Sequence, residues 1–207
     1  PDEAGRALLV CVRGILPELE AAARRTQTLH RHATTDPLTG AYNRRFLYEA
    51  GERILLRGRR QDLRITLLLY DIDDFKRYNE QYGYAAGDEI LRETAGLIRR
   101  ITRTQDLVAR IGGDEFAVLF WDPQPPREPG SQPVDAAYDL ADRFRHAVET
   151  FEFRSLGPEA RGVLSISGGL ARFPDDGATV RELLRRADQA LRAAKRSGKN
   201  SIVLAGR

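Results

Sequence analysis

The hydrophobic pattern of the chain consists mainly of short apolar runs separated by turn residues. These runs predict β-strands at residues 63–70, 106–109, 117–120, 163–166 and 201–204. The first run is rich in Leu and Ile and too short for a typical helix, which indicates a strand buried in the interior. The second and third runs flank Gly112-Gly113. Because glycine readily adopts the positive φ of a tight turn, these two runs predict a β-hairpin.

Helical periodicity occupies most of the intervals between the predicted strands. Apolar residues recurring every three or four positions predict helices at residues 44–60, 75–82, 88–100, 134–150 and 180–197. Asn43 can cap the first of these helices, and Thr179 or a neighbour is expected to start the last. Loops are expected at residues 83–87, which begin and end with glycine, and in the proline-rich stretch 123–133.

The order of the predicted elements defines the fold class. From residue 63 onward the order is strand, helices, hairpin, helix, strand, helix and strand, which is a βαββαβ core with extra elements. The expected fold is therefore α+β and ferredoxin-like, with helices on one face of an antiparallel sheet. In such a core the first strand lies in the middle of the sheet beside the third. The end of the first strand and the hairpin turn are thus expected to meet in space.

Residues 1–33 are predicted to form a separate helical connector, with residues 34–207 as one catalytic domain. Positions of the connector alternate at spacings of four and three, as in a coiled-coil seam: Leu8, Val12, Ile15, Leu19, Ala22, Thr26, Leu29 and Ala33. Gly14 and Pro17 are expected to kink or break this helix. The segment is either a dimerising connector that follows an upstream domain or a single helix packed on its own domain, and we favour the connector. Because the chain starts at Pro1 and contains no Met, we expect a longer protein with an upstream sensory or regulatory domain.

Composition narrows the class of protein. A hydrophobic content of 42% and a charged content of 30% fit a globular domain with a well-solvated surface. No apolar run approaches the ~20 residues that span a bilayer, and no signal peptide is visible. The single cysteine, Cys11, suits a reducing compartment. We therefore expect a cytoplasmic location, either as a cytoplasmic protein or as the cytoplasmic part of a membrane-bound or multidomain protein.

The basic charge balance does not indicate a nucleic-acid partner. The net charge is +3, but arginines are spread along the chain and alternate with acids, as on ordinary helix surfaces. A nucleic-acid groove would need a continuous basic stripe with stacking aromatic residues, which is missing. Lysine is more informative, because the whole chain contains only Lys76, Lys195 and Lys199.

Carboxylates gather at the two places that the fold is expected to bring together. Asp71, Asp73 and Asp74 follow the first buried strand, and Asp114 and Glu115 follow the two glycines of the hairpin. Like charges repel unless a cation neutralises them, and carboxylate oxygens favour Mg²⁺ or Mn²⁺. The simplest alternative is a hairpin turn with two solvated acids.

With these residues in view, the chain resembles the GGDEF family of diguanylate cyclases from Thr34 to Leu204. The resemblance rests on five motifs in the family's order and spacing: Asp36-x-Leu38-Thr39-Gly40-x-x-Asn43-Arg44, Asp71-Ile72-Asp73-x-Phe75-Lys76, Gly83-x-x-x-Gly87-Asp88, Gly112-Gly113-Asp114-Glu115-Phe116, and Ala194-Lys195 with Gly198-Lys199-Asn200. It implies a palm-type nucleotidyl cyclase that condenses two GTP molecules into cyclic di-GMP with loss of two pyrophosphates. Two facing domains of a homodimer would each supply one GTP.

The resemblance also implies a role for each matching residue. The metals that bridge the phosphates would be held by Asp71, Asp114, Glu115 and the carbonyl of Ile72. Either turn acid could help to remove the proton of the attacking hydroxyl. The remaining positions would bind substrate: Gly112 and Gly113 by close approach of the backbone, Asn79 and Asp88 at the guanine edge, Phe75 beside them, and Lys76, Lys195 and Lys199 at the phosphates, with Lys76 also counted as catalytic.

A second site for the product is implied by Arg103-Thr104-Gln105-Asp106, which matches the family's RxxD inhibitory site. Arg103 would fork onto a guanine or phosphate of cyclic di-GMP, Asp106 would accept from its guanine, and Arg143 would complete the site from the same or another subunit. The alternative is an ion pair at a helix end. Three positions depart from the family pattern, namely Glu80, Tyr84 and Gly168.

Two other functions compete with cyclase activity. One is a receptor that has lost turnover and binds GTP or cyclic di-GMP, but such members usually lack the turn or the first-strand acid, and both are present here. The other is a different palm-type nucleotidyltransferase, which Asp88 and the Arg103/Asp106 pair argue against. Dimerisation through residues 1–33 would support any of these functions.

Overall fold

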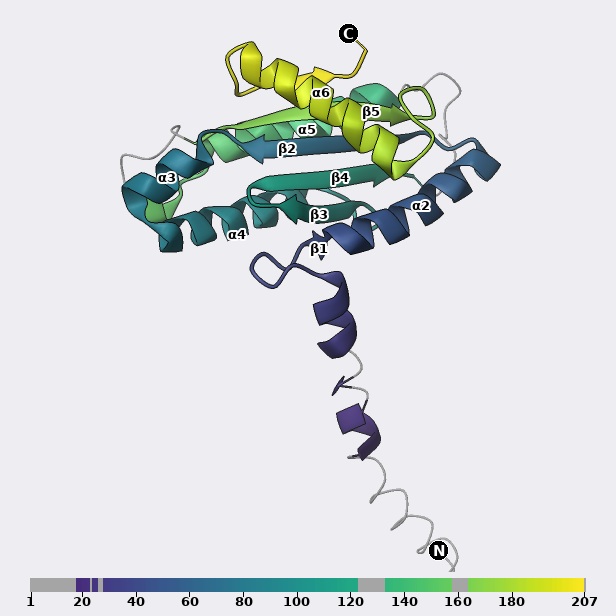
Figure 1. The fold of residues 1–207 in the computed structure, drawn as a ribbon, viewed down its shortest axis with the longest axis horizontal. Helices are drawn as coiled ribbons and strands as arrows, with labels where there is room; N and C mark the ends of the chain where they lie inside the picture. Colours follow the sequence, from purple (N-terminus) through teal and green to yellow (C-terminus); the bar gives the residue numbers. More distant parts are fainter. Residues whose placement is uncertain (1–17, 23, 26–27, 123–132, 158–163, 207) are drawn as a thin grey trace, which may run out of the picture. The chain divides into compact units, whose positions relative to one another are not determined.

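In the computed structural model, a six-stranded sheet forms the centre of the domain (Figure 1). The structure describes residues 18–22, 24–25, 28–122, 133–157 and 164–206. The strands are β1 (Tyr42–Asn43), β2 (Ile65–Ile72), β3 (Leu107–Gly112), β4 (Glu115–Trp121), β5 (Ile166–Phe173) and β6 (Ile202–Leu204), in the spatial order β1-β3-β4-β2-β5-β6. The hairpin β3–β4 and the central place of β2 beside β4 are confirmed. The short strand β1, which pairs in parallel with β3, was not predicted.

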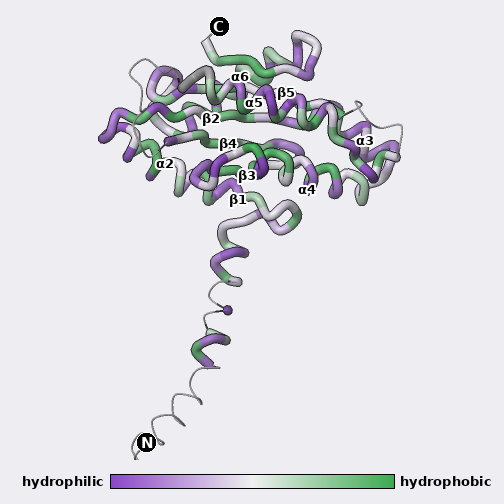
Figure 2. Tube along the Cα trace, turned by 180° about the vertical axis from the view of Figure 1, so that it is seen from behind, coloured by the Kyte–Doolittle hydropathy of each residue, from purple (hydrophilic) through white to green (hydrophobic). Residues whose placement is uncertain are grey.

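Helices connect these strands and are amphipathic, as the change between hydrophilic and hydrophobic residues along each of them shows (Figure 2). They are α2 (Arg44–Gln61), α3 (Phe75–Tyr82), α4 (Tyr84–Ile101), α5 (Pro133–Thr150), the short 3₁₀ helix η1 (Arg154–Leu156) and α6 (Val180–Arg196). Asn43 caps α2 by accepting from the backbone N–H of Phe46. Thr179 and Glu182 form a capping box on α6. The predicted cap at Asn43 and the predicted start of the last helix at Thr179 are confirmed.

The prediction of helices on one face of the sheet is wrong, because both faces are covered (Figure 1). Leu68, Tyr70 and Ile72 of β2 pack in a core with α4 and α5. Leu67 and Leu69, on the opposite face of the strand, pack in a second core with α2 and α6. A strand covered on both sides needs apolar residues at every position. This explains why the run from Leu63 to Tyr70 is continuous rather than alternating.

Several element boundaries differ from the predictions, and two of the differences involve glycines. Residues 84–87 belong to α4 rather than to a loop, because Gly87 packs against the side chain of Asn79, which occupies the place of a Cβ. Strand β5 starts at Ile166 and runs through Gly168-Gly169 instead of ending before them. Gly169 lies inside this strand because the backbone of α6 at Ala187 and Leu191 packs directly against it.

The chain divides into two compact units, Pro1–Thr35 and Asp36–Arg207. In the first unit the described residues between 18 and 34 are helical, and Leu19 and Leu29 are exposed. Leu8, Val12, Ile15 and Thr26 of the expected seam, with Gly14 and Pro17, lie outside the described residues. The coiled coil and the domain limits therefore stay predictions. Among the described residues, no helix is long and apolar enough to cross a membrane.

Candidate active site

Strand pairing places the acids Asp71 and Glu115 side by side. They are direct partners in the antiparallel register of β2 and β4. Side chains alternate between the two faces of a strand, so Asp71 shares the face of Leu67 and Leu69, and Glu115 shares that of Ala117. Both acids therefore lie at the end of their strands, on the face of the sheet that α2 and α6 cover. The expected meeting of the strand end with the hairpin turn is confirmed.

The electrostatics of this strand end call for a cation. Asp71 is buried, and its pKa is raised to about 6. Burial is the main cause, the negative charges of Asp114 and Glu115 act in the same direction, and Lys195 opposes the shift with its Nζ 2.7 Å from Asp71 Oδ1. Among the described residues no three carboxylate, His or Cys side chains already enclose a metal position. The Lys195 ammonium is the group that neutralises Asp71, and this preference for a positive charge fits a divalent cation.

We expect the stability of the metal-free protein to fall as the pH rises from about 4 to about 6. In this window folded Asp71, with its raised pKa, keeps a proton that the unfolded chain has lost at the ordinary value of 3.8. Above pH 6 the group is charged in both states and the penalty is complete. Asp71→Asn removes the penalty. The difference in free energy of unfolding between this variant and the native protein should therefore grow, in favour of the variant, by about 1 to 2 kcal/mol from pH 4.5 to pH 7.5.

Thermal or urea unfolding in EDTA at these two pH values measures the gain. Glu49→Gln, which removes an exposed carboxylate of α2, controls for the loss of one negative charge. A difference between Asp71→Asn and native protein that stays constant with pH contradicts the assignment.

The turn between β3 and β4 is held by a residue without a predicted role, Arg110. Its Nε and Nη2 donate to the carbonyl oxygen of Gly113 at 2.9 and 2.7 Å. Its Nη1 donates to Asp36 Oδ1 at 3.1 Å, and Asp36 also accepts from Thr39. Burial acts to raise the pKa of Asp36, but these hydrogen bonds lower it overall. The turn is thus fixed to the loop before β1, a link that only the fold reveals.

The glycines of the turn are not needed for a positive φ. Neither Gly112 nor Gly113 has a positive φ, so the reason given for the hairpin is wrong although the hairpin is present. A Cβ on Gly113 would meet no atom within 4 Å, and one on Gly112 would lie 3.5 Å from Glu115 Oε2. The backbone of the turn is therefore open on the side of Gly113.

The three acids at the end of β2 have different surroundings. Only Asp71 faces the turn acids. Asp73 is buried, and its two oxygens accept from the hydroxyls of Ser165 and Ser167 at 2.7 Å. Asp74 begins α3 and pairs with Lys199, whose Nζ lies 2.7 Å from Asp74 Oδ1. Of the three acids, Asp71, which the resemblance assigns to the metal, is thus the one that lies beside the turn acids.

Helices α3 and α4 bring the predicted guanine-binding residues together. A Cβ on Gly87 would clash with Asn79 and would lie 3.2 Å from the ring of Phe75, so Asn79, Phe75 and the start of α4 are in close contact. Asp88 follows Gly87 directly and lies 3.9 Å from Arg92. The absence of a side chain at Gly87 is what permits this approach.

The three lysines are not equally close to the acids. Lys195 contacts Asp71, and Lys199 contacts Asp74. Lys76 is 91% exposed on α3, with its Nζ 3.7 Å from Glu80, so none of its described contacts reaches the acids. The structure thus brings two of the three lysines to the end of β2.

The residues of the predicted product site lie in two places. Asp106 is buried, which raises its pKa, and it accepts from the backbone N–H groups of Arg103 at 2.8 Å and Trp121 at 3.3 Å. The guanidinium of Arg103 pairs with Asp122 at 3.1 Å. Arg143 is exposed on α5, and no hydrogen bond or ion pair in the described part of the chain joins it to Arg103 or Asp106.

Comparison with known proteins identifies the class to which this fold and strand end belong. Residues 33–201 match the family "Diguanylate cyclase, GGDEF domain", and the chain belongs to this family. It is therefore a GGDEF domain of the diguanylate cyclase family, as the sequence motifs predicted.

Individual relatives support this assignment. The chain is 34% identical over 200 residues to diguanylate cyclase DgcP of Pseudomonas aeruginosa, covering 97% of this chain and 28% of that protein. It is 34% identical over 171 residues to response regulator PleD of Caulobacter vibrioides, covering 83% of this chain and 36% of that protein. The chain thus spans about a third or less of these relatives.

A solved structure agrees in fold over nearly the whole chain. The coiled coil and GGDEF domain of DgcB from Caulobacter crescentus, in complex with c-di-GMP, superposes with a TM-score of 0.78 at 29% identity. The match covers 96% of this chain and all of that one. The α+β fold is thus shared with a GGDEF domain.

Proposed function

We propose that this domain condenses two GTP molecules into cyclic di-GMP and two pyrophosphates. The observation that carries the proposal is the register pair Asp71–Glu115 beside the glycine turn, with a lysine ammonium already against Asp71. In this reaction the 3′-hydroxyl of one GTP attacks the α-phosphate of the other. Its barrier is dominated by placing and neutralising phosphate charge.

The acids at the strand end fit a divalent metal, Mg²⁺ or Mn²⁺. Asp71, Asp114, Glu115 and the carbonyl of Ile72 would hold it, because these are hard oxygen donors and Asp71 already takes a cationic partner. When bound, the metal would neutralise phosphate charge and acidify the attacking hydroxyl. Either Asp114 or Glu115 would accept the proton of that hydroxyl.

The remaining residues would bind GTP along α3, the turn and α6. Asn79 and Asp88 would read the guanine edge, with Phe75 packed beside them and Gly87 keeping them close. The turn at Gly112 and Gly113, which is open at Gly113, would admit the phosphates. Lys76, Lys195 and Lys199 would contact the phosphate oxygens as point charges, after Lys195 and Lys199 exchange their carboxylate partners for phosphate.

The proposed reaction needs two domains, since each GTP would attack the other. We propose a homodimer in which residues 1–33 act as the connector to an upstream regulatory domain and residues 34–207 as the catalytic domain. Leu19 and Leu29, exposed on the first unit, are candidates for the contact between connectors. The supply of GTP places the enzyme in the cytoplasm.

Incubation of the chain with GTP and Mg²⁺, followed by mass analysis, tests the proposal. Native protein should form cyclic di-GMP, and an Asp114→Ala, Glu115→Ala double variant should form none. If native protein at dimer-forming concentration yields no product, cyclase activity is refuted. Direct measurement of GTP and cyclic di-GMP binding then tests the receptor alternative.

We also propose product inhibition through Arg103 and Asp106, with Arg143 contributed by the same or another subunit. In the protein without product, the Arg103 guanidinium forms an ion pair with Asp122, so cyclic di-GMP must compete with this carboxylate for Arg103. Arg103→Ala should raise the inhibitory concentration of cyclic di-GMP at least about ten-fold, as for a lost hydrogen bond to a charged group. Asp122→Asn should lower it several-fold because it frees Arg103.

Initial rates at fixed GTP with added cyclic di-GMP measure these shifts. Arg64→Ala, an exposed arginine at the start of β2, serves as the control. Equal inhibition of native protein and Arg103→Ala would contradict the site.

A further inference from the structure

The loop that follows α6 carries an unusual backbone conformation. Lys199 and Asn200 are consecutive residues with φ of 63° and 44°, the left-handed region that side-chain-bearing residues rarely adopt. Such a conformation is unfavourable for these residues, and it persists only where neighbouring groups hold it. One of the two, Lys199, is a proposed phosphate ligand. The groups that hold this loop therefore bear on substrate binding.

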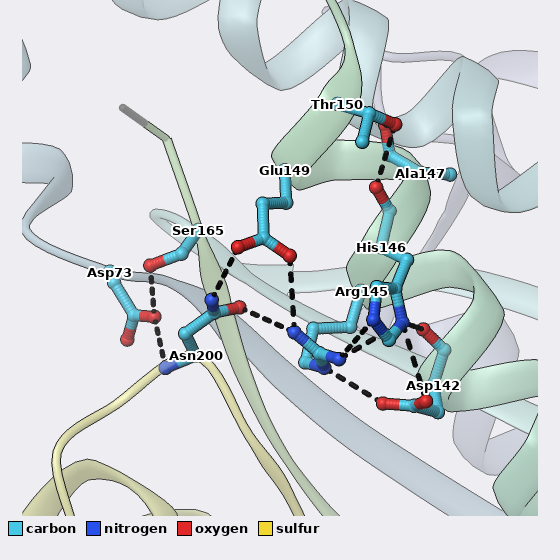
Figure 3. A network of polar contacts seen from close by, with 9 residues as sticks. All are labelled: Asp73, Asp142, Arg145, His146, Ala147, Glu149, Thr150, Ser165 and Asn200. Atoms are coloured by element: carbon cyan, nitrogen blue, oxygen red, sulfur yellow. Dashed lines mark hydrogen bonds and ion pairs between the residues drawn. The ribbon is translucent and has the colours of Figure 1, made fainter. Parts of the chain in front are cut away.

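Asn200 is held by three hydrogen bonds to two other parts of the chain (Figure 3). Its backbone N–H donates to Asp73 Oδ2 at 3.1 Å, beside the end of β2. Its side-chain Nδ2 donates to Glu149 Oε1 at 3.1 Å, and its Oδ1 accepts from Arg145 Nη1 at 3.0 Å. Both hydrogen-bonding groups of the amide are thus used by α5, which fixes the orientation of the side chain.

Arg145 is built into this arrangement rather than lying loose on the helix surface. Its side chain is 13% exposed, its Nε donates to Asp142 Oδ1 at 2.8 Å, and its Nη1 also donates to Glu149 Oε2 at 3.3 Å. Asp142 and Glu149 are one helical turn away on either side and hold the planar guanidinium in place. Its Nη2 also lies 2.9 Å from the ring nitrogens of His146. The contact to Asn200 spans 55 positions of sequence.

The other end of the network lies next to the proposed metal site. Asp73, which receives the Asn200 N–H, is two residues from Asp71 and is itself fixed by Ser165 and Ser167. The residue before Asn200 is Lys199, whose ammonium lies 2.7 Å from Asp74. The network therefore fixes the loop of Lys199 and Asn200 against Asp73 and Asp74, the residues that follow β2.

From these contacts we propose that Arg145 and Glu149 are positioning residues for GTP: they hold Asn200 so that the left-handed loop presents Lys199 to the triphosphate. This rests on the proposed function, which supplies GTP as the ligand. Neither residue touches the substrate, so both act through Lys199. A network that only fastens α5 to the sheet would lower stability without acting through this lysine.

The experiment measures the affinity of a GTP analogue with a methylene bridge between the α- and β-phosphates, in the presence of Mg²⁺, by calorimetry. Arg145→Met and Lys199→Met should each weaken binding at least about ten-fold, as for a lost charge-assisted contact. The double variant should bind no more weakly than Lys199→Met alone, because both substitutions remove the same contact. Arg145→Lys, which cannot reach three acceptors in one plane, should lie between Arg145→Met and native protein.

Two further variants keep the test decisive. Arg192→Met removes an exposed arginine of α6 that pairs with Asp188 at 2.9 Å, and it should bind like native protein. Glu149→Gln retains the shape of the side chain and replaces Arg145→Met if that variant does not fold. Unchanged affinity in a folded Arg145 or Glu149 variant, no loss in Lys199→Met, or additive losses in the double variant would each overturn the inference.

Turnover of GTP by native protein is followed in parallel. Its absence refutes the proposed cyclase activity and leaves the binding comparison intact. Where turnover is present, the Arg145 and Glu149 variants should raise KM for GTP and leave kcat within about three-fold, since saturating GTP restores the bound state.

Discussion

Asp71→Asn is expected to lower GTP turnover at least about 100-fold while the domain stays folded. The reason is that the substitution keeps the shape of the side chain but removes the one buried carboxylate that faces Glu115. Loss of a preorganised group that neutralises developing charge typically costs ~10²- to 10³-fold in rate. Steady-state rates of cyclic di-GMP formation, with circular dichroism as a check on folding, measure the effect.

The matched control is Asp73→Asn, two positions along the chain. Asp73 is already occupied by Ser165, Ser167 and the backbone of Asn200, so its substitution should destabilise the fold by about 1 to 3 kcal/mol. Asp71→Asn should therefore mainly lower turnover, and Asp73→Asn should mainly lower stability. Comparable turnover in Asp71→Asn and native protein would remove Asp71 from the site.

Gly169→Ala is expected to prevent stable folding or to cost at least about 3 kcal/mol. An added Cβ would lie against the carbonyl oxygen of Ala187 and 2.5 Å from the backbone nitrogen of Leu191, and neither can move without displacing α6 from the sheet. Because α6 carries Lys195, activity should be lost together with stability. Urea unfolding measures the cost. If the variant shows no cooperative unfolding transition, the yield of folded protein is compared with that of the native chain.

Gly168→Ala is the neighbouring comparison. Its Cβ would meet the ends of the Ile202 and Leu68 side chains at 2.7 and 3.0 Å, and side-chain ends can shift. We therefore expect a smaller loss, about 1 kcal/mol. Equal losses at the two positions would show that the close approach of α6 is not what requires Gly169. Glycine at 168, where the family usually has an aliphatic residue, is accommodated because Ile202 and Leu68 fill the space.

The sequence was sufficient to predict those parts of the fold and the candidate site that depend on local pattern or on the order of the elements. The run from Leu63 to Tyr70 and the turn at Gly112-Gly113 predict β2 and the hairpin, and their order predicts that Asp71 meets Glu115. What the sequence did not show depends on contacts between distant segments. Whether a glycine ends an element or packs within one depends on what lies opposite it. For Gly87 this is Asn79, and for Gly169 it is the backbone of α6.

The same limit applies to polar residues. Asp71 and Asp73 are both acids that follow the first apolar run, and the sequence does not show their partners. Asp71 pairs with Lys195, whereas Asp73 is held by Ser167 of β5 and by Ser165, the residue before that strand. Arg110 adjoins the turn in sequence, but its partner Asp36 lies 74 positions away. Sequence proximity suggests such residues as candidates, and only the fold assigns their contacts.

The placement of β2 and α3 gives the two halves of the proposed site different local stabilities. Asp71 lies in a strand that is bonded on both sides, so its amide should exchange hydrogen only in the global unfolding reaction. Helix α3 has eight residues, of which only Tyr78 is buried, so its amides should exchange through local opening. Nucleotide binding should therefore slow exchange mainly in α3. The segment that would recognise the base would order upon binding, whereas the segment that would hold the metal is rigid beforehand.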